Sequence, residues 1–193
     1  MTRICVYCAS SARVDSIYFE ATERLAIDFA QNNVGVVYGG GAIGLMGRLA
    51  DVVIREGGHI RGVIPRFMHE VEWTHPKLDE VVFTETMAER KAKFLEGVDG
   101  LVALPGGTGT LEELLEAITL KKLGQFFKPI VILNTVGFYD PLREMFEKCA
   151  RENFIKPKHL ELFRFVDKPE DVLPTIRSMP DYDKDALRDA VVQ

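Results

Sequence analysis

Cysteine is scarce in this sequence, and long hydrophobic runs are absent. The chain has three cysteines among 193 residues, so they cannot all pair with one another, and nothing else suggests an oxidising compartment. No apolar run is long enough to span a bilayer. The amino terminus enters an expected strand directly, without the arrangement of a signal peptide. We therefore expect a cytoplasmic protein with no membrane partner.

An excess of positive charge is also missing. The net charge of −5 and the pI of about 5.5 argue against a general binder of nucleic acid, although a local basic pocket is compatible with both values. The sequence also lacks the elbow motif of a serine hydrolase around Ser10 and Ser11. The four histidines match no metal-ligand spacing, so we expect no metal site at His59, His69, His75 or His159.

Cys5 and Cys8 have the C-x-x-C spacing that redox proteins place at the start of a helix. Here both residues lie in, or at the end of, an expected strand. Because side chains alternate along a strand, positions three apart point to opposite faces of the sheet. We therefore expect no shared metal or disulfide. Cys5 is expected in the core, and Cys8 is placed to line a pocket without being reactive.

Expected strands alternate with expected helices along almost the whole chain. Apolar runs bounded by turn residues predict strands at residues 3–7, 34–38, 59–64, 81–84, 101–104, 129–134 and 163–166. Helical periodicity predicts helices at residues 16–31, 45–56, 87–96, 110–124, 138–153 and 169–179. Several strands are apolar on both faces. The pattern predicts an α/β fold: a single Rossmann-like doubly wound domain at residues 1–180, with a mainly parallel sheet, helices on both faces and a polar tail at 181–193.

In such folds, ligands bind at the carboxyl ends of the strands, near the point where the strand order reverses. Four turns follow strands in this chain and are expected to share one rim, at residues 10–11, 39–44, 65–66 and 105–110. Residues 66–80 form the longest irregular stretch and include Trp73 and His75. Such stretches in compact domains are often lids or pocket walls, so we expect this one to border the site.

The most informative stretch is residues 101–116, which predicts a buried strand, a glycine-rich turn and a helix start. The turn glycines permit positive φ and close backbone approach: Gly106, Gly107 and Gly109. A free helix start binds anions, most often phosphate. Thr110 is expected to be the N-cap of this helix. Glu113, three residues later, fits either the glutamate of a capping box or a chemical role beside the anion, and both interpretations stay open.

A second glycine-rich turn, residues 39–44, matches the G-x-G-x-x-G dinucleotide fingerprint. That fingerprint also requires an acidic residue at the end of the next strand to hold a ribose, and none follows here. We therefore reject a standard NAD site. The turn is expected to be either a wall of a nucleotide pocket or only a tight strand–helix connection.

Arg90 and Lys91 lie on or beside the apolar side of the expected helix at 87–96. Basic residues there can be solvated cations whose stems cover apolar surface. A basic pair on the core side without an adjacent acid more often faces an anion or a distant carboxylate. We favour this functional interpretation.

These motifs together resemble the Lonely Guy (LOG) family, the cytokinin-activating nucleoside-monophosphate phosphoribohydrolases. The resemblance runs from about Ile4 to Phe154 and includes the segments 5–11 and 37–47. Residues 87–91, Met-Ala-Glu-Arg-Lys, correspond to the family motif M-x-x-R-K. Residues 105–113, Pro-Gly-Gly-Thr-Gly-Thr-Leu-Glu-Glu, correspond to P-G-G-x-G-T-x-x-E. The two motifs at this spacing are highly specific.

The resemblance implies an enzyme that hydrolyses the N-glycosidic bond of an N6-substituted adenosine 5′-monophosphate, releasing free base and ribose 5-phosphate. It implies catalytic roles for Arg90 and Glu113. The residues implied to bind the substrate are Glu72, Lys91, Gly106, Gly107, Thr108, Gly109, Thr110, Glu112 and Thr119. It also implies a homodimer, and neither a cofactor nor a metal.

Three alternatives stay open. A protein of this architecture can bind a nucleotide as a sensor without turnover, act mainly on AMP, or transfer the sugar phosphate to an acceptor other than water. Retention of both Arg90 and Glu113 favours the enzyme, because a sensor needs the glycine turn but not that pair. Relatives have often been labelled lysine decarboxylases, but that chemistry needs pyridoxal phosphate on a lysine, and no such site is recognisable.

Overall fold

The computed structural model describes residues 1–69 and 74–182. Its strands, in chain order, are β1 (Thr2–Tyr7), β2 (Val34–Tyr38), β3 (Ile60–Pro65), β4 (Glu80–Thr84), β5 (Gly100–Ala103), β6 (Ile130–Leu133) and β7 (Arg164–Val166). Its α-helices are α1 (Ser16–Gln31), α2 (Gly44–Arg55), α3 (Arg66–His69), α4 (Met87–Leu95), α5 (Thr108–Lys122), α6 (Asp140–Arg151) and α7 (Val172–Ser178). Three short 3-10 helices are η1 (Thr135–Gly137), η2 (Pro157–Leu162) and η3 (Pro169–Asp171).

The described strands form one parallel seven-stranded sheet in the order β4-β3-β2-β1-β5-β6-β7. Successive crossovers from β1 place β2, β3 and β4 on one side of it. The chain then returns to place β5, β6 and β7 on the other side. The strand order therefore reverses between β1 and β5, and the loops that follow these two strands diverge there. A crevice at their carboxyl ends is the usual ligand site of such a sheet.

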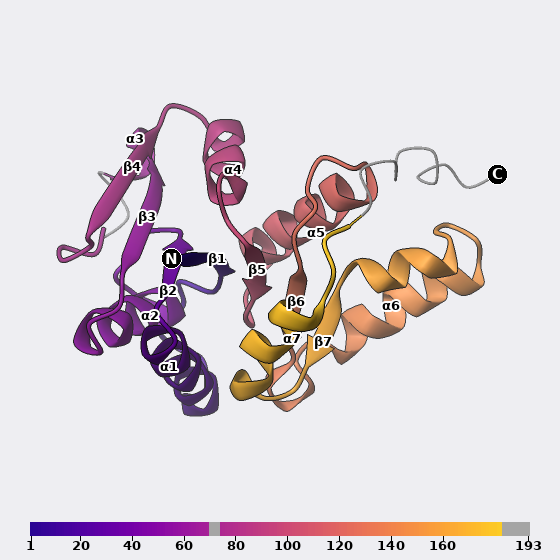
Figure 1. Cartoon of the computed structure of the whole chain (residues 1–193), viewed down its shortest axis with the longest axis horizontal. Helices are drawn as coiled ribbons and strands as arrows, with labels where there is room; N and C mark the ends of the chain where they lie inside the picture. Colours follow the sequence, from indigo (N-terminus) through magenta and orange to yellow (C-terminus); the bar gives the residue numbers. More distant parts are fainter. Residues whose placement is uncertain (70–73, 183–193) are drawn as a thin grey trace.

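Helices cover both faces of this sheet, as the sequence predicts. Side chains from α1, α2 and α7 share one buried cluster with Ile4 and Val6 of β1. Side chains from α4 and α5 share a second cluster with Cys5 and Tyr7 of the same strand. Figure 1 shows α1, α2 and α7 below the sheet and α4 and α5 above it. The predicted Rossmann-like, doubly wound fold is confirmed.

Most element boundaries agree within two residues with those expected from the sequence. The boundaries of α1 agree fully, and Asp15 defines its start by accepting a hydrogen bond from the Ile17 amide at 3.0 Å. After β6, the helix expected at 138–153 begins at Asp140 and ends at Arg151. A 3-10 turn with Val136 at a φ of 48° precedes it. The helix expected at 169–179 divides into η3 and α7.

The part of the expected tail that the structure describes lies against the loop between α5 and β6. Tyr182 donates its amide to the Phe127 carbonyl at 2.7 Å, and Lys128 pairs with Asp181 at 2.7 Å. The rest of that tail, 183–193, lies outside the described residues. Within the described part of the chain, no helix is long and apolar enough to cross a membrane.

Candidate active site at the strand-order reversal

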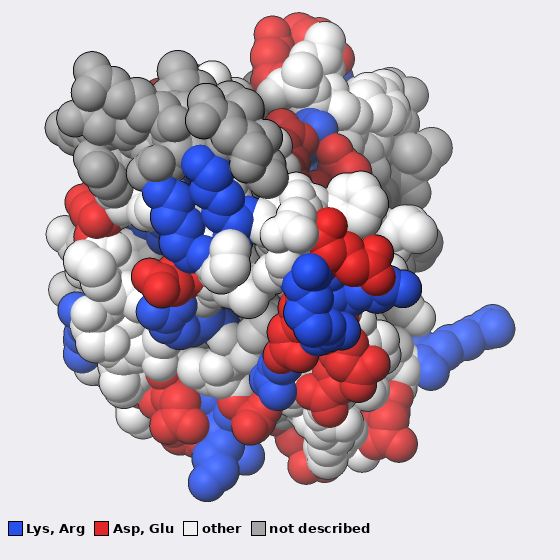
Figure 2. Space-filling view, turned by 90° about the vertical axis from the view of Figure 1, so that its right-hand side faces the viewer, with Lys and Arg blue, Asp and Glu red and all other residues white. Residues whose placement is uncertain are grey.

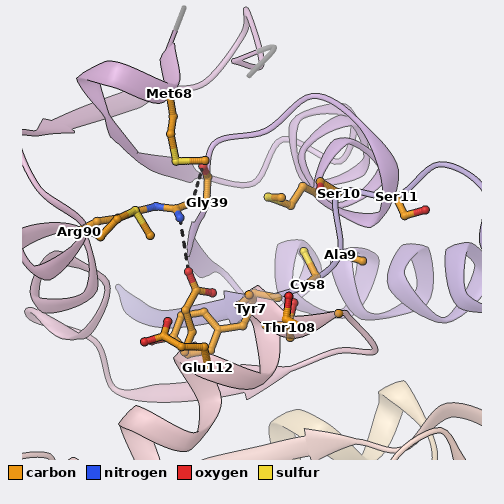
Figure 3. Close-up of a pocket in the computed structure, with 17 residues that line it drawn as sticks. Tyr7, Cys8, Ala9, Ser10, Ser11, Gly39, Met68, Arg90, Thr108 and Glu112 are labelled. Atoms are coloured by element: carbon orange, nitrogen blue, oxygen red, sulfur yellow. Dashed lines mark hydrogen bonds and ion pairs between the residues drawn. The ribbon is translucent and has the colours of Figure 1, made fainter. Parts of the chain in front are cut away.

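A pocket of about 400 Å³ opens at the carboxyl ends of β1, β2 and β5, where the strand order reverses. It is lined by Val6, Tyr7, Cys8, Ala9, Ser10, Ser11, Gly39, Met46, Met68, Met87, Arg90, Gly107, Thr108, Gly109, Thr110, Glu112 and Glu113. Figure 3 shows these side chains converging from the β1 loop, the β2 loop, α3, α4 and the start of α5. The turns after β1, β2 and β5 therefore share one rim, as expected, and α3 supplies the contribution that follows β3.

The amino terminus of α5 forms one wall of the pocket. The helix begins at Thr108, and its N-cap is Gly107, which has no side chain to satisfy the first amides. The N–H groups of Thr108, Gly109 and Thr110 therefore have no partner within the helix, since the first turn of any α-helix leaves its amides free. Free amides at the positive end of a helix dipole bind an anion such as phosphate.

The predicted N-cap at Thr110 is wrong. The N-cap is Gly107, three residues earlier than expected, so Thr110 is a buried residue of the first turn. The capping box with Glu113 does not form, because a capping glutamate must reach back to the N-cap amide and Glu113 instead faces Arg90. Of the two interpretations of Glu113, capping is excluded.

The glycines of this turn are needed for close packing and for open space in the pocket, and not for a positive φ. None of the three predicted positions, Gly106, Gly107 and Gly109, is among the glycines with positive φ. A Cβ on Gly106 would lie 2.2 Å from the Thr110 hydroxyl, so this position must remain small. A Cβ on Gly107 or Gly109 would meet no protein atom within 4 Å, so these two glycines keep the space over the helix start open.

Arg90 is held rigidly on the opposite wall. Its side chain is 8% exposed, its Nε donates to the Val63 carbonyl at 3.1 Å and its Nη2 donates to the Gly39 carbonyl at 3.3 Å. The guanidinium also lies 4.9 Å from the centre of the Phe94 ring. Gly39 lines the pocket, so the second glycine-rich turn is one of its walls. A Cβ at this position would lie 2.8 Å from Arg90 Nη2, so only glycine leaves room for the guanidinium.

Glu113 faces Arg90 across the pocket, with 3.5 Å between Glu113 Oε1 and Arg90 Nη1. Its side chain is only 13% exposed. Burial raises the pKa of the Glu113 carboxyl from its ordinary 4.5 to about 7, although Arg90 acts in the opposite direction. A carboxyl group with a pKa near neutrality can exchange protons at physiological pH and is typical of catalytic sites.

This pKa predicts a pH-dependent stability difference between the wild type and Glu113→Gln. The folded wild type holds a proton on Glu113 up to pH about 7, whereas the unfolded chain releases it near pH 4.5. The carboxyl therefore favours folding below pH 4.5, and this contribution is lost as the pH rises to about 7. Relative to the glutamine variant, the wild type should lose up to about 3 kcal/mol of unfolding free energy across that window. Urea unfolding at pH 5 and pH 8 measures the change, and a difference between the two proteins that is the same at both pH values would contradict it.

Three residues that the resemblance assigns to the substrate lie outside the lining of this pocket. Lys91 turns from the cavity toward α5, where its Nζ lies 2.6 Å from Glu112 Oε1 and also pairs with Glu116. Thr119 is exposed on α5 and donates to the Leu115 carbonyl at 2.8 Å. Gly106 lies beneath the helix start. Glu72 and Trp73 lie outside the described residues.

The sequence interpretation missed the methionines of the pocket, Met46, Met68 and Met87, and also Tyr7. Met87 is the first residue of the M-x-x-R-K motif and Met46 follows the second glycine turn, so position after a strand is the signal that could have identified both. Met68 had no such signal, because α3 lies in the stretch without clear periodicity. The three thioethers add adaptable apolar groups to the pocket lining.

The C-x-x-C residues occupy opposite faces of the sheet, which confirms the strand-face prediction. Cys5 belongs to the buried cluster under α4 and α5, and Cys8 to the cluster under α1 and α2. Both are free thiols, and burial raises the pKa of each above its ordinary value, so neither is activated. Cys8 lines the pocket, as expected.

Histidine does not contribute to the described lining of the pocket. His75 is buried, with its Nε2 3.1 Å from Asp51 Oδ1 and its Nδ1 accepting from the Lys77 amide. Among residues 1–69 and 74–182, no group of three or more His, Cys, Asp or Glu side chains is placed to hold a metal ion. The described lining also contains no lysine, so it does not fit pyridoxal phosphate, which is carried on one.

The pocket therefore combines an anion cradle, a buried carboxyl group and a fixed cation. Known proteins are similar to this chain in sequence. The family model described as "Possible lysine decarboxylase" matches residues 46–176. Cytokinin riboside 5′-monophosphate phosphoribohydrolase LOG2 of Arabidopsis thaliana is 42% identical over 153 residues, covering 79% of this chain and 72% of that protein. The probable phosphoribohydrolase LOGL1 of Oryza sativa subsp. japonica is 43% identical over 154 residues, covering 80% and 69%.

Solved structures share the fold at much lower sequence identity. The molybdenum cofactor carrier protein of Chlamydomonas reinhardtii superposes with a TM-score of 0.70 at 19% identity, covering 91% of this chain and 96% of that one. The molybdenum cofactor binding protein of Rippkaea orientalis gives 0.69 at 18% identity, covering 92% and 96%. These likenesses concern the fold alone. From the family match and the identity to the curated relatives, this chain belongs to the possible lysine decarboxylase family, within its LOG phosphoribohydrolase group.

Proposed function

We propose that this protein is a nucleoside 5′-monophosphate phosphoribohydrolase that cleaves the N-glycosidic bond of N6-substituted adenosine 5′-monophosphates. The observation that carries the proposal is the position of Glu113: a carboxyl group only 13% exposed, on the same helix whose free amino terminus faces the pocket. The curated relatives, named as phosphoribohydrolases acting on cytokinin riboside 5′-monophosphates, support it.

The helix start is suited to the 5′-phosphate. The amides of Thr108, Gly109 and Thr110 are free, and the missing side chains of Gly107 and Gly109 leave room for the phosphate oxygens. A phosphate fixed there holds the ribose next to Glu113. Fixing the sugar lowers the entropic part of the barrier.

The carboxylate of Glu113 then acts on the sugar. As the bond from C1′ to the base nitrogen breaks, positive charge develops on the ribose ring, and a nearby carboxylate stabilises it. Water bonds to C1′ and gives up a proton, which Glu113 can accept because its pKa is about 7. The departing base takes the bonding electron pair and a proton from solvent, and Glu113 returns to solvent the proton that it accepted from water. The products are the free base and ribose 5-phosphate.

Arg90 supports this chemistry from the other wall. Its bonds to the carbonyls of Val63 and Gly39 fix the guanidinium, and its charge opposes the rise in the pKa of Glu113 that burial causes. Part of the enzyme therefore carries an ionised Glu113 at neutral pH. The adaptable thioethers of Met46, Met68 and Met87 in the pocket lining are suited to an apolar N6 substituent on the base.

The proposal predicts that cleavage requires the 5′-phosphate. Isopentenyladenosine and its 5′-monophosphate differ only in the group that the α5 amides are proposed to bind. We expect kcat/KM for the nucleoside to be lower by roughly 10³-fold or more, since several charge-assisted hydrogen bonds are lost. Chromatography of the free base measures both rates. Equal rates would contradict the phosphate cradle, and nucleotide binding without base release would favour a sensor.

We also propose that the protein is a homodimer, through a face that includes α6. None of the 12 residues of α6 is buried, although Leu142 and Phe146 pack against the core. Met145 is 57% exposed, and Phe154 just beyond the helix is 71% exposed. Figure 2 shows acidic and basic side chains lying next to one another on the molecular side that carries α5 and α6, with uncharged surface between them. Such a mixed surface suits a second copy better than a nucleic acid.

Sedimentation at micromolar protein concentration tests the dimer. The wild type should sediment as a dimer, and Met145→Asp should shift it toward the monomer because a charge is placed in the interface. Ile17→Asp places the same charge on the half-exposed start of α1 and should leave the dimer intact. A fully active monomeric wild type would refute the proposal.

A further inference from the structure

Three glutamates crowd the helix that is proposed to bind a phosphate. Glu112, Glu113 and Glu116 lie within its first nine residues. Negative charge near a helix start stabilises the helix, but it opposes the binding of a dianion at the same place. The site therefore needs a means of neutralising the two carboxylates that are not used in the reaction.

The structure separates these three carboxylates by direction. Glu113 points into the pocket and is 13% exposed. Glu112 borders the pocket mouth and Glu116 lies one turn further along; they are 53% and 34% exposed. Both of them pair with one cation, Lys91, whose Nζ lies 2.6 Å from Glu112 Oε1 and also contacts Glu116.

The two cations that meet these acids are consecutive residues of α4. Consecutive residues of a helix point about 100° apart, so Arg90 and Lys91 reach different sides of α5. Arg90 reaches Glu113 inside the pocket. Lys91, 22% exposed, reaches Glu112 at the pocket mouth and Glu116 beyond it.

We propose that Lys91 is a positioning residue that binds the carboxylates of Glu112, at the pocket mouth, and of Glu116, beyond it, leaving Glu113 as the carboxyl group that faces the substrate. It also reduces the negative potential at the phosphate position. The inference rests on the proposed function for its catalytic meaning. It gives Lys91 a role without substrate contact.

The charged groups around Glu113 determine the direction in which its pKa should move when Lys91 is removed. The charged groups that act on Glu113 are Arg90 and Lys91 of α4 and Glu112 and Glu116 of α5. Glu113 in turn acts on three titratable groups of β1 and its loop, Cys5, Tyr7 and Cys8. Burial raises the pKa of the two thiols and of Tyr7, so these stay neutral at neutral pH. Hydrogen bonds to Glu112 and Glu116 raise the pKa of Lys91, so it stays charged. Removing Lys91 deletes a cation and frees two anions, and both changes raise the pKa of Glu113.

The test uses Lys91→Met and the matched control Lys93→Met. Lys93 lies on the same helix but pairs with Glu96 on the solvent side, so its removal deletes the same charge away from α5. We expect the rising acid limb of kcat/KM for isopentenyladenosine 5′-monophosphate to move upward by about half a pH unit or more in Lys91→Met only. KM should rise by roughly three- to tenfold at low salt and by less at high salt. Adding Glu112→Gln to Lys91→Met should return the limb toward its wild-type position.

A carbon-13 NMR titration of glutamate carboxyls, with Glu113 assigned from its loss in Glu113→Gln, measures the same pKa without turnover. A Glu113 pKa that is equal in the wild type and Lys91→Met would overturn the inference, as would a loss of activity with an unmoved limb that Glu112→Gln does not restore. Absence of base release by the wild type would refute the proposed function alone, because the titration still decides the role of Lys91.

Discussion

Replacing Glu113 with glutamine is expected to lower kcat by roughly 10²-fold or more while the fold is retained, the scale of a missing acid–base or electrostatic group. Glutamine has nearly the same shape but supplies neither the negative charge that a cationic sugar needs nor a proton acceptor. The structure removes the competing explanation, because Glu113 does not cap α5. Nucleotide binding should change little, since the anion cradle is made of backbone amides.

Two comparisons make the Glu113→Gln result interpretable. Glu113→Asp keeps the charge but withdraws it from the sugar, so we expect a rate between those of the wild type and the glutamine variant. The unfolding free energy of Glu113→Gln at pH 8 should equal or exceed that of the wild type, because the variant buries no charge. A variant that melts early but keeps its specific activity would show that Glu113 is structural.

Removing the Arg90 side chain is expected to have the second large effect. Arg90→Ala should lower kcat by roughly 10²-fold or more, because the fixed cation opposite Glu113 is lost. It should also destabilise the fold by about 3 kcal/mol or more, since the buried carbonyls of Val63 and Gly39 lose their donors and Glu113 loses its counter-charge. Thermal unfolding and single-substrate kinetics measure the two effects.

Arg90→Lys separates charge from geometry. A lysine keeps the cation but cannot donate to Val63, Gly39 and Glu113 together, so activity should remain far below the wild type. Arg61→Lys is the matched control, because Arg61 pairs with Glu80 at the sheet edge, outside the described pocket lining. Wild-type rates in Arg90→Lys would contradict a positional role for the guanidinium.

The fold could be predicted from the sequence because its signals are local and mutually consistent. The expected boundaries of α1 are correct, since a capping aspartate and a regular apolar face define it. The alternation of strands and helices then leaves few arrangements of the sheet. The sequence misplaces the start of α5, because threonine is a favourable N-cap residue whereas the helix uses Gly107 and buries Thr110. Residue preference alone does not show that Thr110 lies inside the first turn, where a Cβ on Gly106 would collide with it.

The sequence motifs predict which segments form the site, but they do not predict the direction in which each side chain points. The sequence places Arg90 and Lys91 side by side but gives no indication that one enters the pocket while the other turns to Glu112 and Glu116. The raised pKa of Glu113 likewise depends on burial under elements far apart in the chain. Met68 reaches the pocket because it lies on α3, and no periodic pattern in the sequence predicts this short helix.

Product analysis tests the central claim most directly. The wild-type protein is incubated with isopentenyladenosine 5′-monophosphate in buffer that supplies water as the acceptor, and chromatography follows the free base and ribose 5-phosphate. The account predicts free base and ribose 5-phosphate in equal amounts from the wild type, and almost no free base from Glu113→Gln. The rate of AMP cleavage is measured alongside. A wild-type protein that binds the nucleotide but releases no base, or that releases it only with another acceptor present, would contradict the account.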